Sequence, residues 1–279
     1  MNSKVIAKVI ADSISPGGVR LTTLEVTMHR FVLAEFNTHR VFSRNSASSR
    51  AIPMKKFRRR ALEETMWPLW WGANQAGMQA REELKGWRLI VAKRLWELAL
   101  QLNCLIHWGL EKVGLHKQIS NRLLEPWVAH TVIVTSTEWE NFFAQRCHPD
   151  AMPEMRECAE RMREALGNSA PKRLEYGDYH LPYADQFSPE ILPTADYRGT
   201  VVKVSVARCA RVSYLTQDGR RDHREDLQLY NRLSAQTPPH ASPMEHVATP
   251  AREGEEVKGN FRGWHQWRHC RCHEEVQDA

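Results

Sequence analysis

Apolar and polar residues alternate in the amino-terminal part of the chain, as they do in half-buried strands. The run 4–11 is rich in Val and Ile, and in 21–28 every second residue from Leu24 onwards is apolar. Both runs are therefore predicted to be strands. From Phe31 the spacing tightens towards a short helix, which leads into a polar, serine-rich stretch over 39–50 that we expect to be a loop.

A long helical pattern follows. Between Glu82 and about Leu115, apolar residues recur at every third or fourth position, which predicts one or two helices. These helices belong to a helical insertion at about 60–120. The tryptophans of this region are expected to serve as core or as subunit contacts, and they are Trp67, Trp70, Trp71, Trp87 and Trp96.

A strand and two helices are predicted next. Residues 131–135 are mostly β-branched, which is typical of a strand. Thr137 and Glu140 have the spacing of a capping box, so a helix is expected from there towards Arg146. Pro153 suits the first turn of the second helix. The expected buried face of that helix consists of Met152, Met155, Ala159 and Met162.

The last part of the chain is less regular. Residues 168–200 contain four prolines and little periodicity, which indicates a loop-rich connection. Beyond it, 201–206 is predicted to be a strand and 222–233 a helix. Together these elements predict an α+β fold, a single elaborated domain over 1–279 with a mixed or antiparallel sheet and flanking helices.

Composition agrees with a globular protein. Of the 279 residues, 42% are hydrophobic and 26% charged, within the usual range for a packed domain. No run approaches the roughly 18 uncharged apolar residues of a membrane span, and the first residues do not lead into a secretory core. We therefore expect no membrane contact and a cytoplasmic location. Six cysteines without framework spacing suit reduced thiols.

The formal net charge of +6 favours anionic partners but does not separate nucleic acids from nucleotides. The basic run 55–60 is typical of a solvated face, with attraction of anionic substrates as its alternative role. A nucleic-acid-binding module is one alternative function, supported by this run and by ten tryptophans. No known binding motif accompanies them, so nucleic acid is not expected as a partner.

The most informative segment is Thr38-His39-Arg40, followed by Ser48 and Arg50. Basic and hydroxyl side chains on one loop can wrap a phosphate, because Arg offers a planar fork of donors and Ser adds a small neutral donor. Spacing alone leaves a solvated Ser/Arg loop equally open.

This spacing resembles the signature of the flavin-dependent thymidylate synthase family, in which Arg-His-Arg is followed by seven residues and then Ser. The chain departs from it at Thr38, Ser46 and Ala51, where the family has Arg, Glu and Tyr. The block 135–146 resembles the family's nucleotide-activating helix. The resemblance implies that Arg146 contacts the pyrimidine and Asn141 the flavin.

A third resemblance lies near the carboxyl end. Residues 210–214 and 240–246 resemble two family segments that lie at the flavin, through residues that correspond to His240 and Ser242. In many members these segments precede the Arg-His-Arg motif, whereas here they follow it. The region 201–268 is therefore interpreted as a circularly permuted amino-terminal segment of the family.

The resemblance implies a reaction and a set of site residues. The reaction is reductive methylation of dUMP to dTMP with methylenetetrahydrofolate, in which FAD relays hydride from NADPH. Arg146 is the catalytic residue, and its guanidinium stabilises the negative charge of deprotonated uracil. The residues implied to bind substrate are Glu35, Ser48, Ser49 and Arg50, together with Arg146. Those implied to bind flavin are His39, Arg40, Asn141, His240 and Ser242.

The resemblance also implies a homotetramer with active sites at subunit interfaces, and no metal. His130 is the nearest candidate to replace a phosphate-binding Arg that the family has shortly before the 135–146 block. His246 and Arg211, taken alone, are interpreted as structural, and Arg211 as a surface ion pair.

Two alternatives concern cysteines. Cys147 stands beside Arg146, which can lower a thiol pKa, so a cysteine nucleophile that attacks the pyrimidine is a second enzyme hypothesis. The segment His269-Cys270-Arg271-Cys272-His273 has ligands for zinc, but its spacing is tighter than in structural sites and favours a frayed tail.

Overall fold

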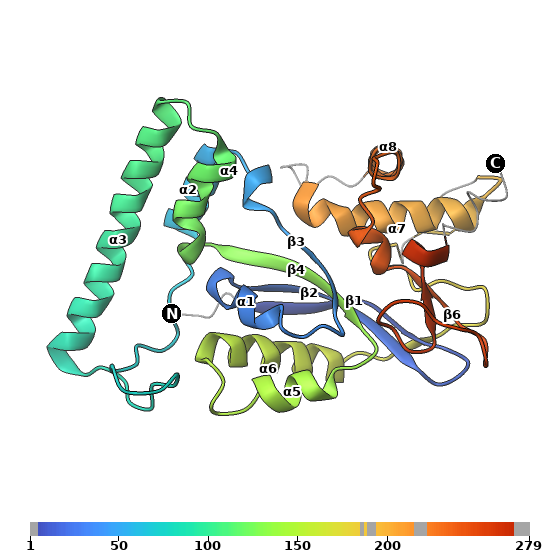
Figure 1. Cartoon of the computed structure of the whole chain (residues 1–279), viewed down its shortest axis with the longest axis horizontal. Helices are drawn as coiled ribbons and strands as arrows, with labels where there is room; N and C mark the ends of the chain where they lie inside the picture. The colour runs from blue at the N-terminus through green and yellow to red at the C-terminus, as the bar shows by residue number, and fades with distance from the viewer. Residues whose placement is uncertain (1–4, 185–186, 189–193, 215–221, 271–279) are drawn as a thin grey trace.

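A five-stranded mixed sheet forms the centre of the computed structural model, which describes residues 5–184, 187–188, 194–214 and 222–270 (Figure 1). The strand order is β3-β4-β2-β1-β5. The strands are β1 (Ile6–Ile14), β2 (Arg20–His29), β3 (Ser43–Ser46), β4 (Ala129–Ser136) and β5 (Lys172–Arg173). Only the pair β1 and β5 is parallel, so the predicted α+β class with a mixed sheet is confirmed.

The two strands predicted at the amino terminus form a hairpin. β1 pairs antiparallel with β2 from Ile6 opposite Thr27 to Ile14 opposite Arg20. Gly18 in the connecting turn has φ +79°, a conformation that glycine adopts without steric cost. The alternating residues of β2 lie in the main core, where Leu24 and Met28 are fully buried.

The serine-rich stretch is not entirely a loop, because Ser43–Ser46 forms the edge strand β3. It pairs antiparallel with β4, and its polar side chains find partners far along the chain. Gln266 donates to the Ser43 hydroxyl, and the Asn45 amide donates to the carbonyl of Cys209. These long-range bonds explain a buried strand that lacks apolar alternation.

Helices α5 (Glu140–Arg146) and α6 (Pro153–Gly167) lie together below the sheet in Figure 1. Pro153 is in the first turn of α6, and Met155, Ala159 and Met162 are buried as predicted. Met152 was predicted on the same face but is 41% exposed, because it precedes the helix and has an extended backbone.

The predicted capping box is wrong at Thr137. The helix begins at Glu140, and the Thr137 hydroxyl instead accepts from the backbone N–H of Arg262. The Glu140 carboxylate does reach back, but it accepts from the N–H of Trp139. Thr137, which the local pattern predicted as the helix cap, is therefore engaged in a tertiary contact with Arg262 instead.

The run 201–206 was predicted to be a strand but lies in helix α7 (Tyr197–Tyr214). Val202, Val206 and Ala210 recur at helical spacing and pack on α8 (His223–Ser234), which confirms the predicted helix there. Cys209 and Val212 pack on Ile133 of β4. α7 is packed on more than one side, so apolar residues occur at most of its positions. A continuous run of valines of this kind has the same sequence pattern as a buried strand.

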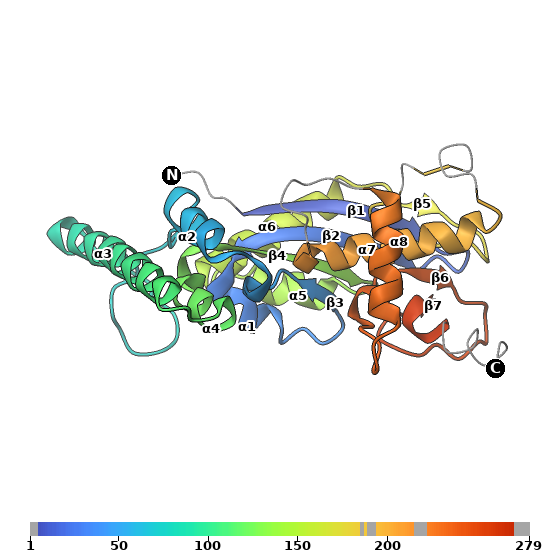
Figure 2. The same ribbon diagram turned by 90° about the horizontal axis from the view of Figure 1, so that it is seen from above.

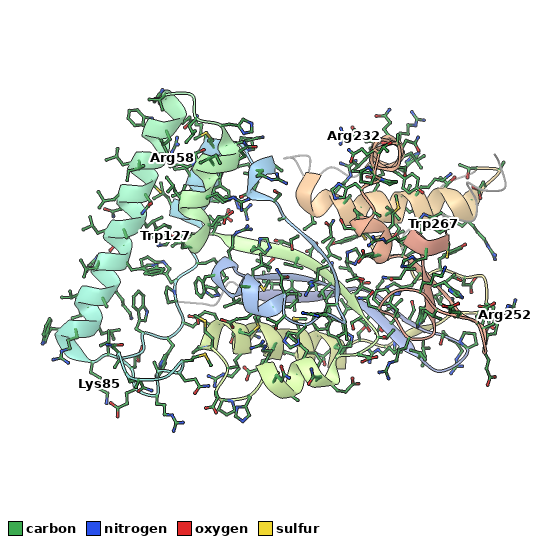
Figure 3. All side chains as sticks on the ribbon, in the orientation of Figure 1. Arg58, Lys85, Trp127, Arg232, Arg252 and Trp267 are labelled. Atoms are coloured by element: carbon green, nitrogen blue, oxygen red, sulfur yellow. The ribbon has the colours of Figure 1, made fainter. Side chains whose placement is uncertain are left out.

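α7 and α8 lie on the side of the sheet away from α5 and α6 (Figures 1 and 2). Below them, η4 (Ser242–Glu245) precedes a small antiparallel pair of strands, β6 (Ala248–Pro250) and β7 (Trp264–Gln266). Trp264 is fully buried, and Trp267 packs in the same core as α7 and α8 (Figure 3). The described residues 242–270 are therefore packed on the rest of the fold.

The helices predicted within 60–120 form an arm at one end of the molecule, together with flanking helical segments (Figure 1). It contains α2 (Met54–Glu63), the single long helix α3 (Gly86–Lys112), α4 (Lys117–Ser120) and η3 (Asn121–Trp127). Phe57, Leu100 and Trp127 belong to its own small core, and Figure 3 shows Trp127 between α3 and the sheet. In the described part of the chain, no helix is long and apolar enough to cross a membrane.

The short helix predicted from Phe31 also forms. It consists of η1 (Arg30–Val32) followed by α1 (Leu33–Phe36), and it ends where the Thr38-His39-Arg40 segment begins.

Candidate active site

Two predicted site residues from distant parts of the chain meet directly. Arg146 at the end of α5 donates from Nε to His39 Nε2 at 2.9 Å, and from Nη2 to the Thr38 hydroxyl at 3.1 Å. Among the described residues, the Nη1 group of Arg146 has no hydrogen-bond partner. We call Arg146, His39 and Thr38 the Arg146 cluster.

The ring of His39 is held in one state by this contact. Arg146 can only donate, so Nε2 of His39 accepts and its proton is on Nδ1. Burial lowers the pKa of His39, and the charges of Arg146 and Arg44 lower it further. Phe142 packs edge-on against the imidazole at 4.9 Å. The cluster therefore combines a fixed cation with a neutral imidazole.

The backbone around the cluster is held by Arg44. Its Nη1 donates to the carbonyls of Phe36 and His39, at 3.3 and 3.0 Å. Burial lowers the Arg44 pKa, against the charge of Glu245, which raises it. This cation therefore fixes the loop that presents Thr38 and His39.

Three other predicted residues lie near the cluster in the chain. Arg40 and Asn141 are exposed, and Asn141 accepts from the side-chain amide of Gln145, one residue before Arg146. Glu35 is half-buried, and its carbonyl accepts from the Thr38 hydroxyl. The structure places these polar groups at the surface beside the two motif segments.

The blocks at 210–214 and 240–246 lie against the motif strand although they come much later in the sequence. η4, which begins at Ser242, packs on β3 and on α7. The backbone N–H of His240 donates to the carbonyl of Leu233 at the end of α8. These later blocks and β3, the strand that follows the Thr38-His39-Arg40 segment, are therefore neighbours in space.

His246 belongs to a buried chain of hydrogen bonds. Its Nδ1 contacts the Thr135 hydroxyl at 2.7 Å, Thr135 contacts Thr23, and Thr23 contacts Nε2 of His180. His180 Nδ1 in turn contacts the Ser13 hydroxyl at 2.8 Å. This chain ties the carboxyl-terminal segment to the sheet, so the structural interpretation of His246 is confirmed.

Arg211 is also structural, but it is buried rather than at the surface. Its Nε and that of Arg208 contact the two carboxylate oxygens of Asp226, at 2.5 and 2.9 Å, and Asp226 is fully buried. Two guanidinium groups and one carboxylate join α7 to α8. Removal of one partner from such a buried group typically destabilises a protein by roughly 3–5 kcal/mol.

A cavity of about 150 Å³ opens at the end of β3, beside the predicted nucleotide-binding serines. Ser48 and Ser49 line it, and so do three cationic residues from two other elements, Arg30, Lys56 and Arg60. His130 and Val212 complete the part of the wall that comes from β4 and α7. We call it the His130 cavity.

An ion-pair network fixes the wall of this cavity. Glu125 accepts from Arg30 Nη2 at 3.0 Å and from the Ser49 hydroxyl at 2.7 Å. Arg122 contacts the same carboxylate oxygen. The side-chain amide of Asn121 donates to the Ser49 carbonyl at 2.8 Å, so η3 holds the predicted serine in place.

His130 presents an unusual buried donor. Arg30 Nη1 donates to its Nδ1 at 2.7 Å, which requires the proton of the neutral ring to be on Nε2. That buried Nε2 has no hydrogen-bond partner among the described residues. Burial, aided by the charge of Arg30, lowers the pKa of His130 to about 3. Nε2 is therefore a buried donor on a residue that lines the cavity.

The sequence interpretation did not identify Arg30, and it placed Lys56 and Arg60 on a solvated face with attraction of anionic substrates as the alternative role. The i, i+4 spacing of Lys56 and Arg60 on a helix would have placed them on one side. Arg30 offered no local signal, because its partners Glu125 and His130 lie about a hundred residues away. Arg50 is exposed and does not line the cavity.

The Arg146 cluster and the His130 cavity are separate within one chain. None of Arg146, His39, Asn141, His240 and Ser242 lines the cavity. One chain therefore presents two partial sites.

Cys147 does not have the properties of an activated nucleophile. Burial raises the pKa of its thiol, and the charge of Arg163 only partly opposes this effect. A reactive cysteine requires a lowered pKa. The cysteine-nucleophile hypothesis is therefore not favoured.

The carboxyl-terminal His/Cys segment lies only partly within the described residues, since 271–279 are outside them. Over the residues that are described, no group of three His, Cys, Asp or Glu side chains is arranged to hold a metal ion.

Comparison with known structures found several similar chains. A UMP/dUMP methylase, PolB from Streptomyces cacaoi bound with 5-Br dUMP, is 14% identical, with 60% of this chain and 91% of that chain covered and a TM-score of 0.45. Thymidylate synthase X from Helicobacter pylori, solved with FAD and dUMP, is 17% identical, with coverage of 53% and 67% and a TM-score of 0.37. No curated protein sequence matches the chain.

A family comparison gives the assignment. The model of the thymidylate synthase complementing protein family matches residues 14–172, more than half of the chain. The matched region contains both the Thr38-His39-Arg40 segment and the helix that ends at Arg146. The protein therefore belongs to the thymidylate synthase complementing protein family, as an enzyme of the flavin-dependent thymidylate synthase type, a methyltransferase.

Proposed function

We propose that the protein converts dUMP to dTMP by reductive methylation, with methylenetetrahydrofolate as carbon donor and NADPH as reductant. The observation that carries this proposal is the Arg146 cluster, in which two family segments about a hundred residues apart form direct hydrogen bonds. FAD, when bound, relays the hydride from NADPH, which is chemistry that no side chain supplies.

Arg146 is the proposed catalytic residue. Its guanidinium stays protonated at every relevant pH, so it acts by electrostatic stabilisation rather than by proton transfer. His39 and Thr38 orient Nε and Nη2, which leaves the Nη1 donors to approach the O2 and N3 side of a deprotonated uracil ring. Such fixed donors lower the energy of charge that develops in the transition state.

The donors at the surface beside the Arg146 cluster suit FAD. Arg40 provides an exposed cation for a pyrophosphate, and Asn141 provides an exposed amide for a ring edge. His240 and Ser242 are half-buried on the segment that packs on β3, and with His39 they complete the proposed flavin contacts. These are the residues that would hold the cofactor.

The His130 cavity is the proposed phosphate end of the nucleotide site. Lys56, Arg60 and the Ser48 hydroxyl on its wall favour an anion with several acceptor oxygens, to which the Nε2–H of His130 is proposed to donate. Its volume of about 150 Å³ is below the 300–1,000 Å³ typical of whole-ligand pockets, so it holds one end of dUMP only. Arg50 and Glu35 are proposed to contact the remainder.

We further propose that complete active sites form between subunits of a homotetramer. Neither Arg146 nor any of the proposed flavin contacts lines the His130 cavity, which supports a site that two subunits complete. A partner subunit then supplies the second half of each site.

The chain is proposed to be one domain over 1–279, with the helical insertion at about 60–120 and the connection at 168–200. The family match ends at residue 172, before the blocks at 210–214 and 240–246. Their packing on β3 supports the proposal that 201–268 is a permuted segment of the same domain. Permutation disturbs little buried backbone when it joins or cuts chain ends at a surface.

The purified protein is expected to be yellow and to bind FAD without a covalent bond. Addition of dUMP with methylenetetrahydrofolate to the reduced protein under anaerobic conditions should reoxidise the flavin and produce dTMP. Arg40→Ala should weaken FAD binding about tenfold, the loss of one charge-assisted hydrogen bond. The exposed Arg59→Ala on α2 controls for loss of charge. Colourless protein that neither binds FAD nor forms dTMP contradicts the proposal.

His130→Ala should weaken dUMP binding by roughly 10- to 100-fold, because it removes a buried donor to a charged ligand. Lys56→Ala, a substitution on the cavity wall that leaves His130 in place, should act in the same direction. Calorimetric titration with deoxyuridine, which lacks the phosphate, should show little change for either variant. His148→Ala, at an exposed position, is the control. Equal losses for dUMP and deoxyuridine contradict the phosphate assignment.

A further inference from the structure

The long helix α3 is apolar on two opposite faces. One face is buried on α2 and η3 through Leu100, Cys104 and His107. The other face forms an outer edge of the molecule in Figure 1. Its apolar residues, including the one that follows the helix, are each 44 to 78% exposed, and they are Trp87, Ile90, Val91, Leu95, Leu98, Leu102, Leu105, Ile106, Trp108 and Val113. We call them the α3 outer face.

The area of this face exceeds what a lone chain normally exposes. Ten large side chains at these exposures present on the order of 1,000 Å² of apolar surface, whereas the largest patch of a typical monomer is about 300–600 Å². A standard interface takes about 800 Å² from each partner. A helix that is apolar all round is normally buried. The α3 outer face is therefore large enough for one stable interface.

We propose that the α3 outer face pairs with the same face of a second copy of this chain, with the two helices antiparallel. Val91, Leu95, Leu98, Leu102 and Leu105 follow each other at steps of four, three, four and three residues. This is the spacing by which two helices interlock along a seam. Because the seam is a single continuous stripe, an identical copy complements it under two-fold symmetry.

Charge favours the antiparallel arrangement. Arg88, Lys93 and Arg94 lie in the amino-terminal half of α3, and Lys85 precedes it (Figure 3). A parallel pair would place these cations opposite their own copies, and like charges across a contact are unfavourable. An antiparallel pair separates them and also aligns the two helix dipoles in opposite directions.

Shape complementarity gives the register. If Leu98 lies at the two-fold axis, Trp87 of one helix faces Gly109 of the other, since both are eleven residues from Leu98. Trp87 is 70% exposed, and a side chain at Gly109 would meet nothing within 4 Å. The largest projecting residue at one end of the stripe therefore faces the residue without a side chain at the other.

This pairing does not depend on the proposed reaction. The buried side of α3 packs on α2, and Lys56 and Arg60 of α2 line the His130 cavity. Association through α3 therefore stiffens one wall of the cavity while the outer face carries no site residue. Pairing through α3 is measured by comparing the mass of the wild-type chain with that of a Leu98 variant, without flavin or nucleotide. An assembly that forms dTMP but keeps its mass in the Leu98 variant contradicts the α3 pairing alone.

The first test is sedimentation of the full chain and of Leu98→Glu at micromolar concentration. The exposed position of Leu98 allows the variant to fold, which circular dichroism checks. Leu98→Glu should halve the mass of the assembly and weaken the association at least 100-fold, because two carboxylates would face each other in an apolar seam. Leu62→Glu, an equally exposed leucine on α2, should leave the mass unchanged.

The second test is cross-linking. Under mild oxidation, Leu98→Cys should form a covalent dimer, and Leu62→Cys should remain at the level of the unmodified protein. A wild-type chain that stays monomeric, or Leu98→Glu with unchanged mass, would overturn the proposal. So would wild-type binding to phosphatidylglycerol vesicles that Leu98→Glu abolishes without any change in mass, since the occupant would then be a lipid surface.

Discussion

Arg146→Lys is expected to lower kcat/KM for dUMP by about 10²–10³, the typical effect of losing one transition-state donor. Lysine keeps the charge but cannot donate to His39 and Thr38 while it also presents donors to the substrate. The loss should appear mainly in kcat, since the proposed interaction strengthens as negative charge develops on the uracil ring. Steady-state kinetics with purified, flavin-loaded protein measure it.

The neighbouring residue supplies the control for this substitution. Cys147→Ser should keep turnover within about tenfold, or ~1.4 kcal/mol, because the proposed route forms no bond to a protein thiol. The raised pKa of Cys147 agrees with that expectation. A folded, flavin-binding Cys147→Ser protein without activity would support the cysteine nucleophile instead, and Arg146→Lys with wild-type kcat would remove Arg146 from the catalytic role.

The folded protein should lose stability steeply in mild acid. Burial lowers the pKa of His130, His180 and His246 to about 3, from an ordinary value near 6.5. Below pH 6.5 these three imidazoles are protonated in the unfolded chain and neutral in the folded one, so unfolding takes up protons and is favoured. Above pH 6.5 both states are neutral and the effect disappears.

The expected size follows from proton linkage. Each fully unmatched proton contributes about 1.36 kcal/mol per pH unit, so three histidines lower the free energy of unfolding by about 4 kcal/mol between pH 5.5 and 4.5. A domain of ordinary stability has roughly 5–15 kcal/mol in total, so one at the lower end of this range is expected to unfold above pH 4. Asp12, whose carboxyl pKa is lowered by contacts with Arg20 and Ser169 against the opposing effect of burial, adds loss at lower pH.

Urea unfolding followed from pH 7 to pH 4.5 measures this slope. His130→Asn removes one of the three groups. The change in unfolding free energy per pH unit should therefore fall by up to the contribution of one proton, about 1.36 kcal/mol. His148→Asn changes an exposed histidine and should leave it nearly unchanged. If the unfolding free energy changes over this range by less than one proton's contribution per pH unit, the fold does not keep the three imidazoles neutral.

The local pattern of apolar and polar residues was sufficient to predict the elements that are stabilised mainly by one apolar face. The alternation in β2, the helical spacing in α3 and the proline at the start of α6 each indicate their structure without knowledge of any partner. The same holds for chemistry that depends on residue type. Arg146 and His39 were identified through the resemblance of two short segments to family motifs, which needs no knowledge of the fold.

Long-range contacts decided the rest. Ser43–Ser46 is a strand because β4 pairs with it and because Asn45 and Ser43 bond to residues more than 160 positions away. The valines of α7 are helical because α8 and the sheet bury several sides of them, which overrides their preference for strands.

The His130 cavity shows the same division. The serines and the basic run were visible in the sequence, but only the tertiary structure joins Arg30, Glu125 and His130 into one wall. The α3 pattern likewise predicted a helix and not which of its faces the chain itself covers. Sequence periodicity reports how residues are spaced on an element, whereas hydrogen-bond partners and buried faces depend on which distant segments pack there.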